Sequence, residues 1–450
     1  MENKITEDNL YRLAIGIMEK YKVSYEEALT KLSSFNLLLN CGESIRDSKI
    51  LQVSLITAVN TGKRAFLGGV YVIIPEKVEA LFPWPGNKTL NEIVRELGAT
   101  TAISDIDFSF VLNFGIPADI NKNSLQVVCN AWQGGFLSSP EEIHLPANDS
   151  ITIGGVLAAG LSVAVAFMRV SGISILAGEV SSGISLWRPD LHWLDKEAGG
   201  PSIKRVPKRY WVLGLGHLGQ AYLWCLALLG INDPSQVEIL LQDFDKITEA
   251  NQSSGLLCED NIKKYKTRVC SEWLENRHFI TKITERMFDG NTIREGEEPF
   301  LALCGFDNSV ARTFLENAKF DFIVECGLGN KLFNFDSIFL HTFPNASKTS
   351  AEIWGTGSGE ETLNQTVLEE FKDKSEDCGI LALTLAKKAV SASFVGAVAA
   401  SLVIAEVLRS CDEGLRYEKI AVKLRDTNSI NAITLKPFDT ELVANGYIEI

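Results

Sequence analysis

The sequence is poor in the patterns that mark disulfide-rich and zinc-binding proteins. Its nine cysteines include no C-x-x-C pair, and its five histidines are scattered along 450 residues. A two-pair structural zinc site needs closely spaced ligands, and a disulfide framework needs a patterned, even set of cysteines, so neither is expected. The N-terminus lacks the charged-then-apolar pattern of a secretory signal. We therefore expect reduced thiols and a cytoplasmic protein.

Basic residues are also scarce. Lysine and arginine number 43 against 57 aspartates and glutamates, which gives a net charge of −14. Nucleic acids and anionic lipid surfaces repel such a chain unless a local basic patch compensates. The longest basic cluster, Lys204-Arg205 with Lys208-Arg209, is short. Neither a nucleic-acid partner nor a membrane partner is expected.

Two long apolar runs require a decision between membrane and core. Residues 154–168 are too short to span a bilayer comfortably, whereas residues 389–408 reach the roughly 20 residues that a span needs. The second run nevertheless carries Ser391, Ser401 and Glu406 and is rich in alanine and glycine. Because small residues suit a helix packed closely on a sheet, we expect core helices rather than membrane spans.

The chain is predicted to divide into two α/β halves. Residues 186–209 combine prolines, a Gly-Gly-Pro and a polar-basic run, so we expect a linker there and domains of 1–195 and 200–450. The first sixty residues are expected to be helical. Strands are expected near 70–75, 108–114 and 125–132. Two halves of similar size also suggest a diverged duplication.

The second half begins with a predicted β-α-β unit. A buried strand at 210–213 runs directly into Gly214-Leu-Gly216-His-Leu-Gly219, and a helix and a second strand ending in Asp243-Phe-Asp245 follow. In this pattern the first glycine allows a tight turn, the second lets a phosphate approach, and the third lets helix pack on strand. A carboxylate at the tip of the second strand can bind ribose hydroxyls. A nucleotide site is expected, and NAD, FAD and ATP all fit at this point.

The residues that follow differ from those of a dehydrogenase. Asn251 lies six residues beyond Asp245, Lys266 stands at the start of a predicted helix, and Asp307-Asn308 end a later strand. In this order the sequence resembles the ThiF family, the adenylating enzymes of thiamine and molybdopterin sulfur transfer, whose fold the ubiquitin-activating enzymes share. The resemblance covers about 210–330 and, more loosely, 375–410. It implies a Rossmann-like adenylation domain with a mostly parallel sheet and MgATP as cofactor.

The resemblance also implies roles for individual residues. Asp243 would hold the ribose, Asn251 and Lys266 would contact the phosphates, and Asp307 would bind Mg²⁺ and act with Lys266 in catalysis. Adenylation brings two anions together, so cations and N–H dipoles at the site are required. A structural alternative stays open for each: Asp307-Asn308 would cap the next helix, and residues 263–266 would form a solvated face.

The chain departs from the family pattern at one position. Ser254 stands where the family usually has an arginine that contacts the triphosphate. Arg268, or Arg64 from the first half, is a candidate replacement. His217, inside the glycine loop, is expected to face solvent, and contact with a phosphate is the alternative.

Cys378 is a candidate thioester cysteine. It follows an acidic stretch and precedes the small-residue run, where ThiF relatives can carry a reactive cysteine that accepts the activated acyl group. A nucleophilic cysteine acts as the thiolate and therefore needs a helix N-terminus or a cation nearby. The alternative is a cysteine that packs the start of a helix. Cys304 and Cys326 lie in strand-like runs and are expected to be buried.

The function implied by the resemblance is ATP-dependent adenylation of the C-terminal carboxylate of a small ubiquitin-like protein, followed by thioester formation on Cys378. A downstream conjugating carrier, a homodimer or pseudodimer, and a bacterial conjugation or antiviral defence setting are implied as well. The first half would then resemble the inactive adenylation half of ubiquitin-activating enzymes. Two alternatives stay open: a nicotinamide-dependent oxidoreductase and a catalytically degenerate scaffold.

Overall fold

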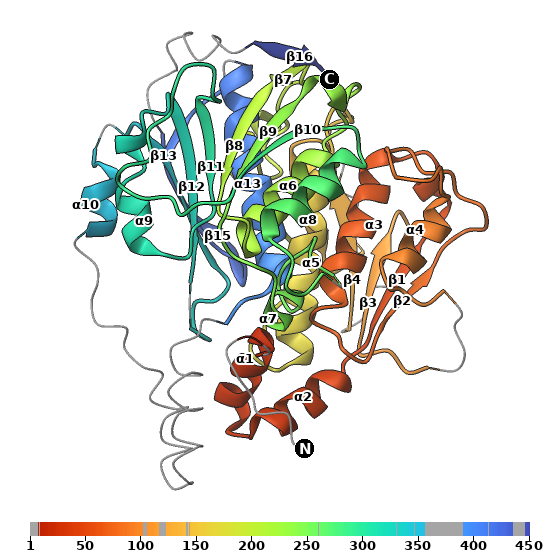
Figure 1. The fold of residues 1–450 in the computed structure, drawn as a ribbon. Helices are drawn as coiled ribbons and strands as arrows, with labels where there is room; N and C mark the ends of the chain where they lie inside the picture. The colour runs from red at the N-terminus through yellow and green to blue at the C-terminus, as the bar shows by residue number, and fades with distance from the viewer. Residues whose placement is uncertain are drawn as a thin grey trace, which may run out of the picture.

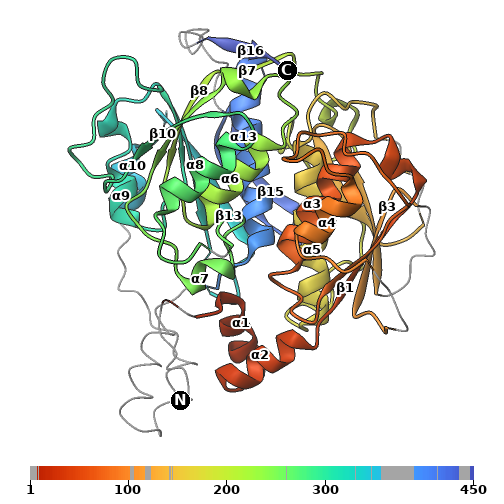
Figure 2. The ribbon, with the colours of Figure 1, turned by 45° about the vertical axis from the view of Figure 1, so that its right-hand side comes forward.

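The computed structural model describes most of the 450-residue chain in two interlocked halves (Figures 1 and 2). The described residues are 8, 10–101, 106–116, 123–140, 143, 145–259, 261–329, 331–345, 347–355, 390–412, 414–434 and 446–450. Cys378, the candidate thioester cysteine, lies outside them.

The first half is built on a mixed sheet of six strands in the order β2-β1-β3-β4-β5-β6. Its strands are β1 (Leu37–Cys41), β2 (Val70–Ile73), β3 (Phe110–Phe114), β4 (Ser124–Cys129), β5 (Gln133–Leu137) and β6 (Ser182–Ser185). Its helices are α1 (Arg12–Tyr21), α2 (Tyr25–Ser33), α3 (Lys49–Gly62), α4 (Leu90–Glu96) and α5 (Ile153–Val170). The expectation that the first sixty residues are helical is wrong at β1, because this short apolar run pairs with β2 and β3 at the centre of a sheet.

The second half contains an eight-stranded sheet in the order β10-β9-β8-β11-β12-β13-β14-β15. Its strands are β8 (Arg209–Leu213), β9 (Glu238–Gln242), β10 (Ile280–Thr284), β11 (Leu301–Cys304), β12 (Phe322–Leu328), β13 (Ser337–Phe343), β14 (Tyr417–Lys423) and β15 (Asp426–Thr434). Its helices include α6 (His217–Ala227), α7 (Glu249–Gln252), α8 (Lys266–Glu275), α9 (Ser309–Thr313), α10 (Ser350–Gly355) and α13 (Ser393–Cys411). A short antiparallel ribbon pairs β7 (Arg205–Pro207), in the segment between the two large sheets, with β16 (Tyr447–Glu449).

The two sheets repeat one topology. In the first, β1 lies parallel between β2 and β3, β4 is parallel to β3, and β5 and β6 add antiparallel. In the second, β8 lies parallel between β9 and β11, β12 is parallel to β11, and β13 and β14 add antiparallel. Helix α3 matches α6 in this scheme and α5 matches α13, while β10 and β15 are additions at the edges. The strand order therefore supports the suggested duplication.

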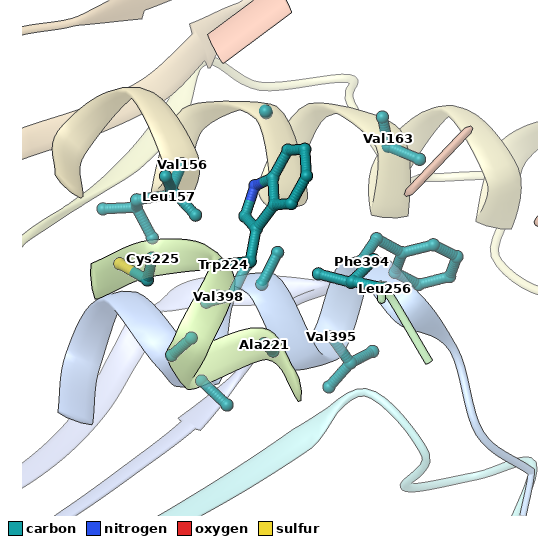
Figure 3. Packing of buried hydrophobic residues seen from close by; sticks show 14 of the residues in the cluster. Val156, Leu157, Val163, Ala221, Trp224, Cys225, Leu256, Phe394, Val395 and Val398 are labelled. Carbon is teal, nitrogen blue, oxygen red and sulfur yellow. The ribbon is translucent and has the colours of Figure 1, made fainter. Parts of the chain in front are cut away.

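The halves share one hydrophobic core across the matched helices. Helix α5 packs against α13, and Figure 3 shows Val156 of α5, Trp224 of α6 and Val398 of α13 in the same cluster. A Cβ placed on Gly160 of α5 would lie 2.7 Å from Val398 Cγ2, so the two helices approach too closely for a larger residue there. Each fully buried valine or leucine contributes about 1.5–3 kcal/mol, and we therefore expect the halves to unfold together.

A buried ion pair fastens α13 to the segment between the sheets. Glu406 and Arg409 have no exposed side-chain surface and pair with each other. Arg409 donates to the carbonyls of Leu186 and, at 3.0 Å, Leu415, and Glu406 Oε1 accepts the backbone N–H of Tyr417 at 3.0 Å. Every polar group of the pair thus has a partner, as buried charges require.

Helices α5 and α13 are the two described helices that are long and apolar enough to cross a membrane. In the apolar window of α5, 89% of the residues are buried inside the protein, and in that of α13 the share is 94%. The prediction that both runs form core helices agrees with this packing.

Candidate active site

The glycine loop joins β8 to α6 and leaves one side open. Gly214 has a φ of +81°, which favours glycine, and Gly219 packs so closely that an added Cβ would lie 1.9 Å from the Gly214 carbonyl oxygen. Around Gly216, by contrast, an added Cβ would meet nothing within 4 Å. Gly216 is also the N-cap of α6, where unpaired N–H groups and the helix dipole attract anions. The loop therefore has the geometry of a phosphate site.

Asp243, at the tip of β9, stabilises this loop. Its carboxylate accepts the N–H of Leu215 at 2.6 Å and the N–H of Asp245 at 2.8 Å, and only 9% of the residue is exposed. Burial raises the pKa of Asp243, while Lys266 acts in the opposite direction. The predicted ribose contact would use the remaining lone pairs of a carboxylate that already fixes the loop.

Lys266 connects the acidic residues of the site. It opens α8, is 7% exposed, and places Nζ 2.7 Å from Asp245 Oδ2 and 4.0 Å from Asp243 Oδ2. Burial alone would lower the pKa of Lys266, but the charges of Asp243, Asp245 and Asp307 outweigh it and the pKa is raised. Lys266 is therefore a firmly protonated cation at the mouth of the loop. The alternative of a solvated face is wrong for this residue.

Asp307 lies at the end of β11, on the same edge of the sheet. The next residue, Asn308, caps α9 by accepting the N–H of Val310 at 2.8 Å, so the capping alternative holds for Asn308. Asp307 itself is exposed. Mg²⁺ is commonly bound through one or two carboxylates plus substrate phosphates, and the described residues contain no cluster of three acidic, histidine or cysteine ligands. Asp307 has the chemistry and exposure that such a site needs.

A buried network behind Asp307 was missed from the sequence. Arg312 donates to the carbonyl of Phe306 at 2.9 Å and lies 3.2 Å from Glu325 Oε1, while His341 Nδ1 contacts Glu325 Oε2 at 3.1 Å. Glu325 is completely buried on β12. Its charge raises the pKa of Arg312 against the effect of burial. A glutamate inside the apolar run Phe322–Cys326 was the signal in the sequence.

Asn251 lies in the short helix α7, where it forms a capping box with Thr248. Its side-chain oxygen accepts the N–H of Thr248 at 2.9 Å, so the carboxamide NH₂ is the group left to meet a phosphate. Ser254, at the family's arginine position, is buried. Of the candidate replacements, Arg268 is exposed and bonds Glu285 at 2.8 Å.

Two arginines of the first half, Arg12 and Arg64, lie close to the candidate active site of the second half. Arg64 is 3% exposed and its Nη2 lies 2.7 Å from Glu259 Oε1. The N–H of Arg12 donates to Ser253 Oγ at 3.3 Å, and the charges of Arg12 and Arg64 both lower the pKa of His217. The first half thus places cations within electrostatic reach of the glycine loop.

The expectation that His217 faces solvent is wrong. Its Nδ1 contacts Ser391 Oγ at 2.8 Å, its Nε2 is enclosed, and a Cβ on Gly396 would lie 2.4 Å from Nε2. Burial lowers the pKa of His217 to about 4, so the imidazole is neutral near pH 7. His217 therefore packs the loop against the start of α13.

None of the described cysteines has the environment of a nucleophile. Seven of the eight are buried, and burial raises the thiol pKa of all eight, Cys304 and Cys326 included. The expectation that Cys304 and Cys326 are buried strand residues is confirmed.

Comparison with known proteins identifies the chain, with its doubled α/β topology and its open glycine loop, as a bacterial E1-like protein. Two family models match the chain: the BilD N-terminal domain over residues 36–186 and the BilD C-terminal domain over residues 206–414. A bacterial E1-like protein BilD from Collimonas sp. (strain OK412) is 35% identical over 446 residues, which is 97% of this chain and 95% of that protein. The chain belongs to the BilD family.

Solved structures give more distant matches. MccB of E. coli is 18% identical, with a TM-score of 0.35 over 53% of this chain and 65% of that chain. The E. coli tRNA N6-threonylcarbamoyladenosine dehydratase TcdA is 15% identical, with a TM-score of 0.30 over 45% of this chain and 85% of that chain. TcdA has been solved with AMP and with ATP.

Proposed function

We propose that this chain adenylates the C-terminal carboxylate of a small ubiquitin-like protein with MgATP. The observation that carries the proposal is the open space at Gly216, next to a buried cation and exposed acidic groups at one sheet edge. Membership of the BilD family of E1-like proteins supports the same reaction class. The NAD-dependent alternative does not require an ion-paired lysine between two aspartates at this edge.

The chemistry assigns each group a task. A substrate carboxylate oxygen attacks the α-phosphorus, the bond to the β-phosphate breaks, and pyrophosphate leaves with the electron pair. The loop N–H groups and Lys266 stabilise charge on the phosphates. Asp307 would hold Mg²⁺, which neutralises phosphate charge when bound. Arg12 and Arg64 offset the missing arginine at Ser254 by adding positive charge from the first half.

A second step on Cys378 completes the proposal. The thiolate attacks the acyl carbonyl of the adenylate, a thioester forms, and AMP leaves with the electrons of the broken anhydride bond. The support is by elimination: the eight described cysteines have raised thiol pKa values and are poor nucleophiles.

The first test is thermal stability with MgATP, with NAD(H) and with neither. A ligand at a hundred times its Kd adds about 2.7 kcal/mol to the native state. We expect stabilisation by MgATP that Asp307→Ala removes and that Glu43→Ala, an exposed carboxylate after β1, retains. Stabilisation by NAD(H) alone would overturn the proposal in favour of an oxidoreductase, and a response to neither nucleotide would favour a scaffold.

The second test separates the two steps. Exchange of labelled pyrophosphate into ATP, in the presence of a ubiquitin-like protein ending in glycine, reports adenylate formation. Cys378→Ser should keep this exchange and lose the thioester adduct between the two proteins, which excess thiol cleaves by acyl exchange. Loss of exchange in Cys378→Ser would contradict the assignment of Cys378 to the second step alone.

A further inference from the structure

A polar cleft lies between the two halves, at the far end of α8 from the nucleotide loop. It has a volume of about 570 Å³ and is lined by the segment after β2, including Phe82, Trp84 and Lys88, and by Asn276 and Arg277 just beyond α8. Lys266 opens the ten-residue α8, which spans about 15 Å. The cleft is therefore separate from the candidate active site.

Arg277 forms the inner wall of this cleft. Its guanidinium lies 4.5 Å from the ring centre of Trp84 and 3.7 Å from that of Trp273, so two indole rings hold it. The residue is 6% exposed. Burial lowers the pKa of Arg277 to about 10, and it stays charged at neutral pH.

The donors of Arg277 are only partly used. Nη1 donates to the carbonyl of Trp273 at 2.9 Å, and Nε is enclosed with no partner in the described part of the chain. Nη2 has no hydrogen bond to a described residue and is not among the enclosed atoms, so it is the donor that opens to the cleft. A buried arginine with unused donors normally has an acceptor.

The neighbouring charges define the acceptor. Glu96 pairs with Lys88 and accepts the hydrogen bond of Trp84 Nε1 at 3.4 Å. Its charge raises the pKa of Arg277, against the larger lowering effect of burial. The lining of the cleft includes Glu79, which is exposed, but not Glu96. Arg277 itself has no ion-pair partner among the described residues. The carboxylates of Glu79 and Glu96 repel a doubly charged anion more strongly than a singly charged one. A ligand with one negative charge is therefore the better partner for the single guanidinium of Arg277.

We propose that this cleft binds a carboxylate-bearing peptide segment, with Arg277 as its anchor. A guanidinium edge donates to a carboxylate in a charge-assisted geometry, and the flanking Phe82 and Trp84 offer apolar surface to the rest of the segment. The carboxylate comes either from a chain terminus or from an aspartate or glutamate side chain. The site is independent of the proposed adenylation.

Calorimetric titration of the full chain tests this, with and without saturating MgATP. The probes are N-acetylglycine for a terminal carboxylate, N-acetyl-aspartic acid α-methylamide for a side-chain carboxylate, and inorganic phosphate. We expect saturable binding of one carboxylate probe that Arg277→Met weakens at least tenfold and that Asp307→Ala leaves unchanged. The methionine preserves a long apolar side chain between the two indoles.

Asn276→Trp serves as a second variant, because Asn276 is exposed and its replacement would obstruct the cleft without altering Arg277. It should also weaken the carboxylate probe, and it keeps the test decisive if Arg277→Met fails to fold. The proposal is overturned if neither carboxylate saturates at tens of millimolar, if phosphate binds more tightly than both, or if binding is the same in both variants and wild type. These outcomes do not depend on ATP binding.

Discussion

The turns that follow β1 and β8 occupy the same position in two copies of one topology, yet only the second is open. After β1, a Cβ on Gly42 would lie 2.5 Å from the Gly115 carbonyl oxygen and 2.7 Å from Ile116, so the chain's own residues fill the space. After β8, a Cβ on Gly214 would lie 3.0 Å from Phe306 Cδ1, but around Gly216, two residues further on, an added Cβ would meet nothing within 4 Å. The second strands differ too, because β9 is followed by Asp243 and β2 by Ile74. The same strand arrangement therefore holds an open turn after β8 and a turn filled by the chain's own residues after β1.

The largest expected effect comes from the glycines that define this contrast. Gly219→Ala should destabilise the protein by about 3 kcal/mol or more, since its Cβ overlaps the Gly214 carbonyl. Gly42→Ala should also destabilise the protein but leave the nucleotide affinity of the folded protein unchanged.

Gly216→Ala should keep the wild-type Tm and lose MgATP affinity. Denaturation curves and calorimetry check all three variants. A Gly216→Ala variant that binds MgATP normally would contradict the assignment of the open turn after β8 as the phosphate site.

Lys266→Met should weaken MgATP binding by about ten- to a hundredfold. A hydrogen bond to a charged group contributes about 1.5–3 kcal/mol, and Lys266 is the cation between Asp245 and Asp243. The matched control is Lys49→Met, at the first residue of α3 in the other half. Equal losses in the two variants, measured by calorimetry, would contradict a site confined to the second half.

Arg312→Lys should destabilise the chain by about 1–3 kcal/mol and weaken the MgATP response several-fold. Lysine lacks the planar fork that contacts both Phe306 and Glu325, and Phe306 precedes Asp307. A structural role alone would lower Tm without changing nucleotide affinity. Comparison of urea melts with ATP titrations at a temperature where both proteins are folded distinguishes the two roles.

The smallest effect concerns pH. The pKa of His217 is lowered from 6.5 to about 4 in the folded chain, so the unfolded chain binds an extra proton between these values. Stability linked to His217 is therefore complete above about pH 6.5 and falls as the pH drops toward 4. His217→Gln should flatten this part of the Tm profile between pH 4 and 7. An unchanged profile would show that His217 is not buried neutral.

The sequence was most informative where local pattern and local geometry coincide. The glycine loop, the strand before it and the carboxylates after β9 are close in the chain, and their spacing alone predicts a nucleotide turn. The apolar small-residue runs likewise predict α5 and α13. The boundaries 1–195 and 200–450 stay predictions, because α5 and α13 share one core.

Long-range contacts were beyond the same reasoning. The strand β1 is short and looks helical in isolation, and only pairing with β2 and β3 makes it a strand. The contact between His217 and Ser391 joins residues far apart in sequence, as does the network of Arg312, Glu325 and His341. No regular spacing in the sequence relates these partners, so a sequence pattern does not predict their contacts.

The close approach of α5 and α13 at Gly160 has a consequence for stoichiometry. Two copies of the same topology are joined in one polypeptide and pack against each other through α5 and α13. Of the two described turns after β1 and β8, one leaves open space for a phosphate. Under the proposed function, calorimetry should therefore give one nucleotide per chain, and each chain would activate one acyl group at a time.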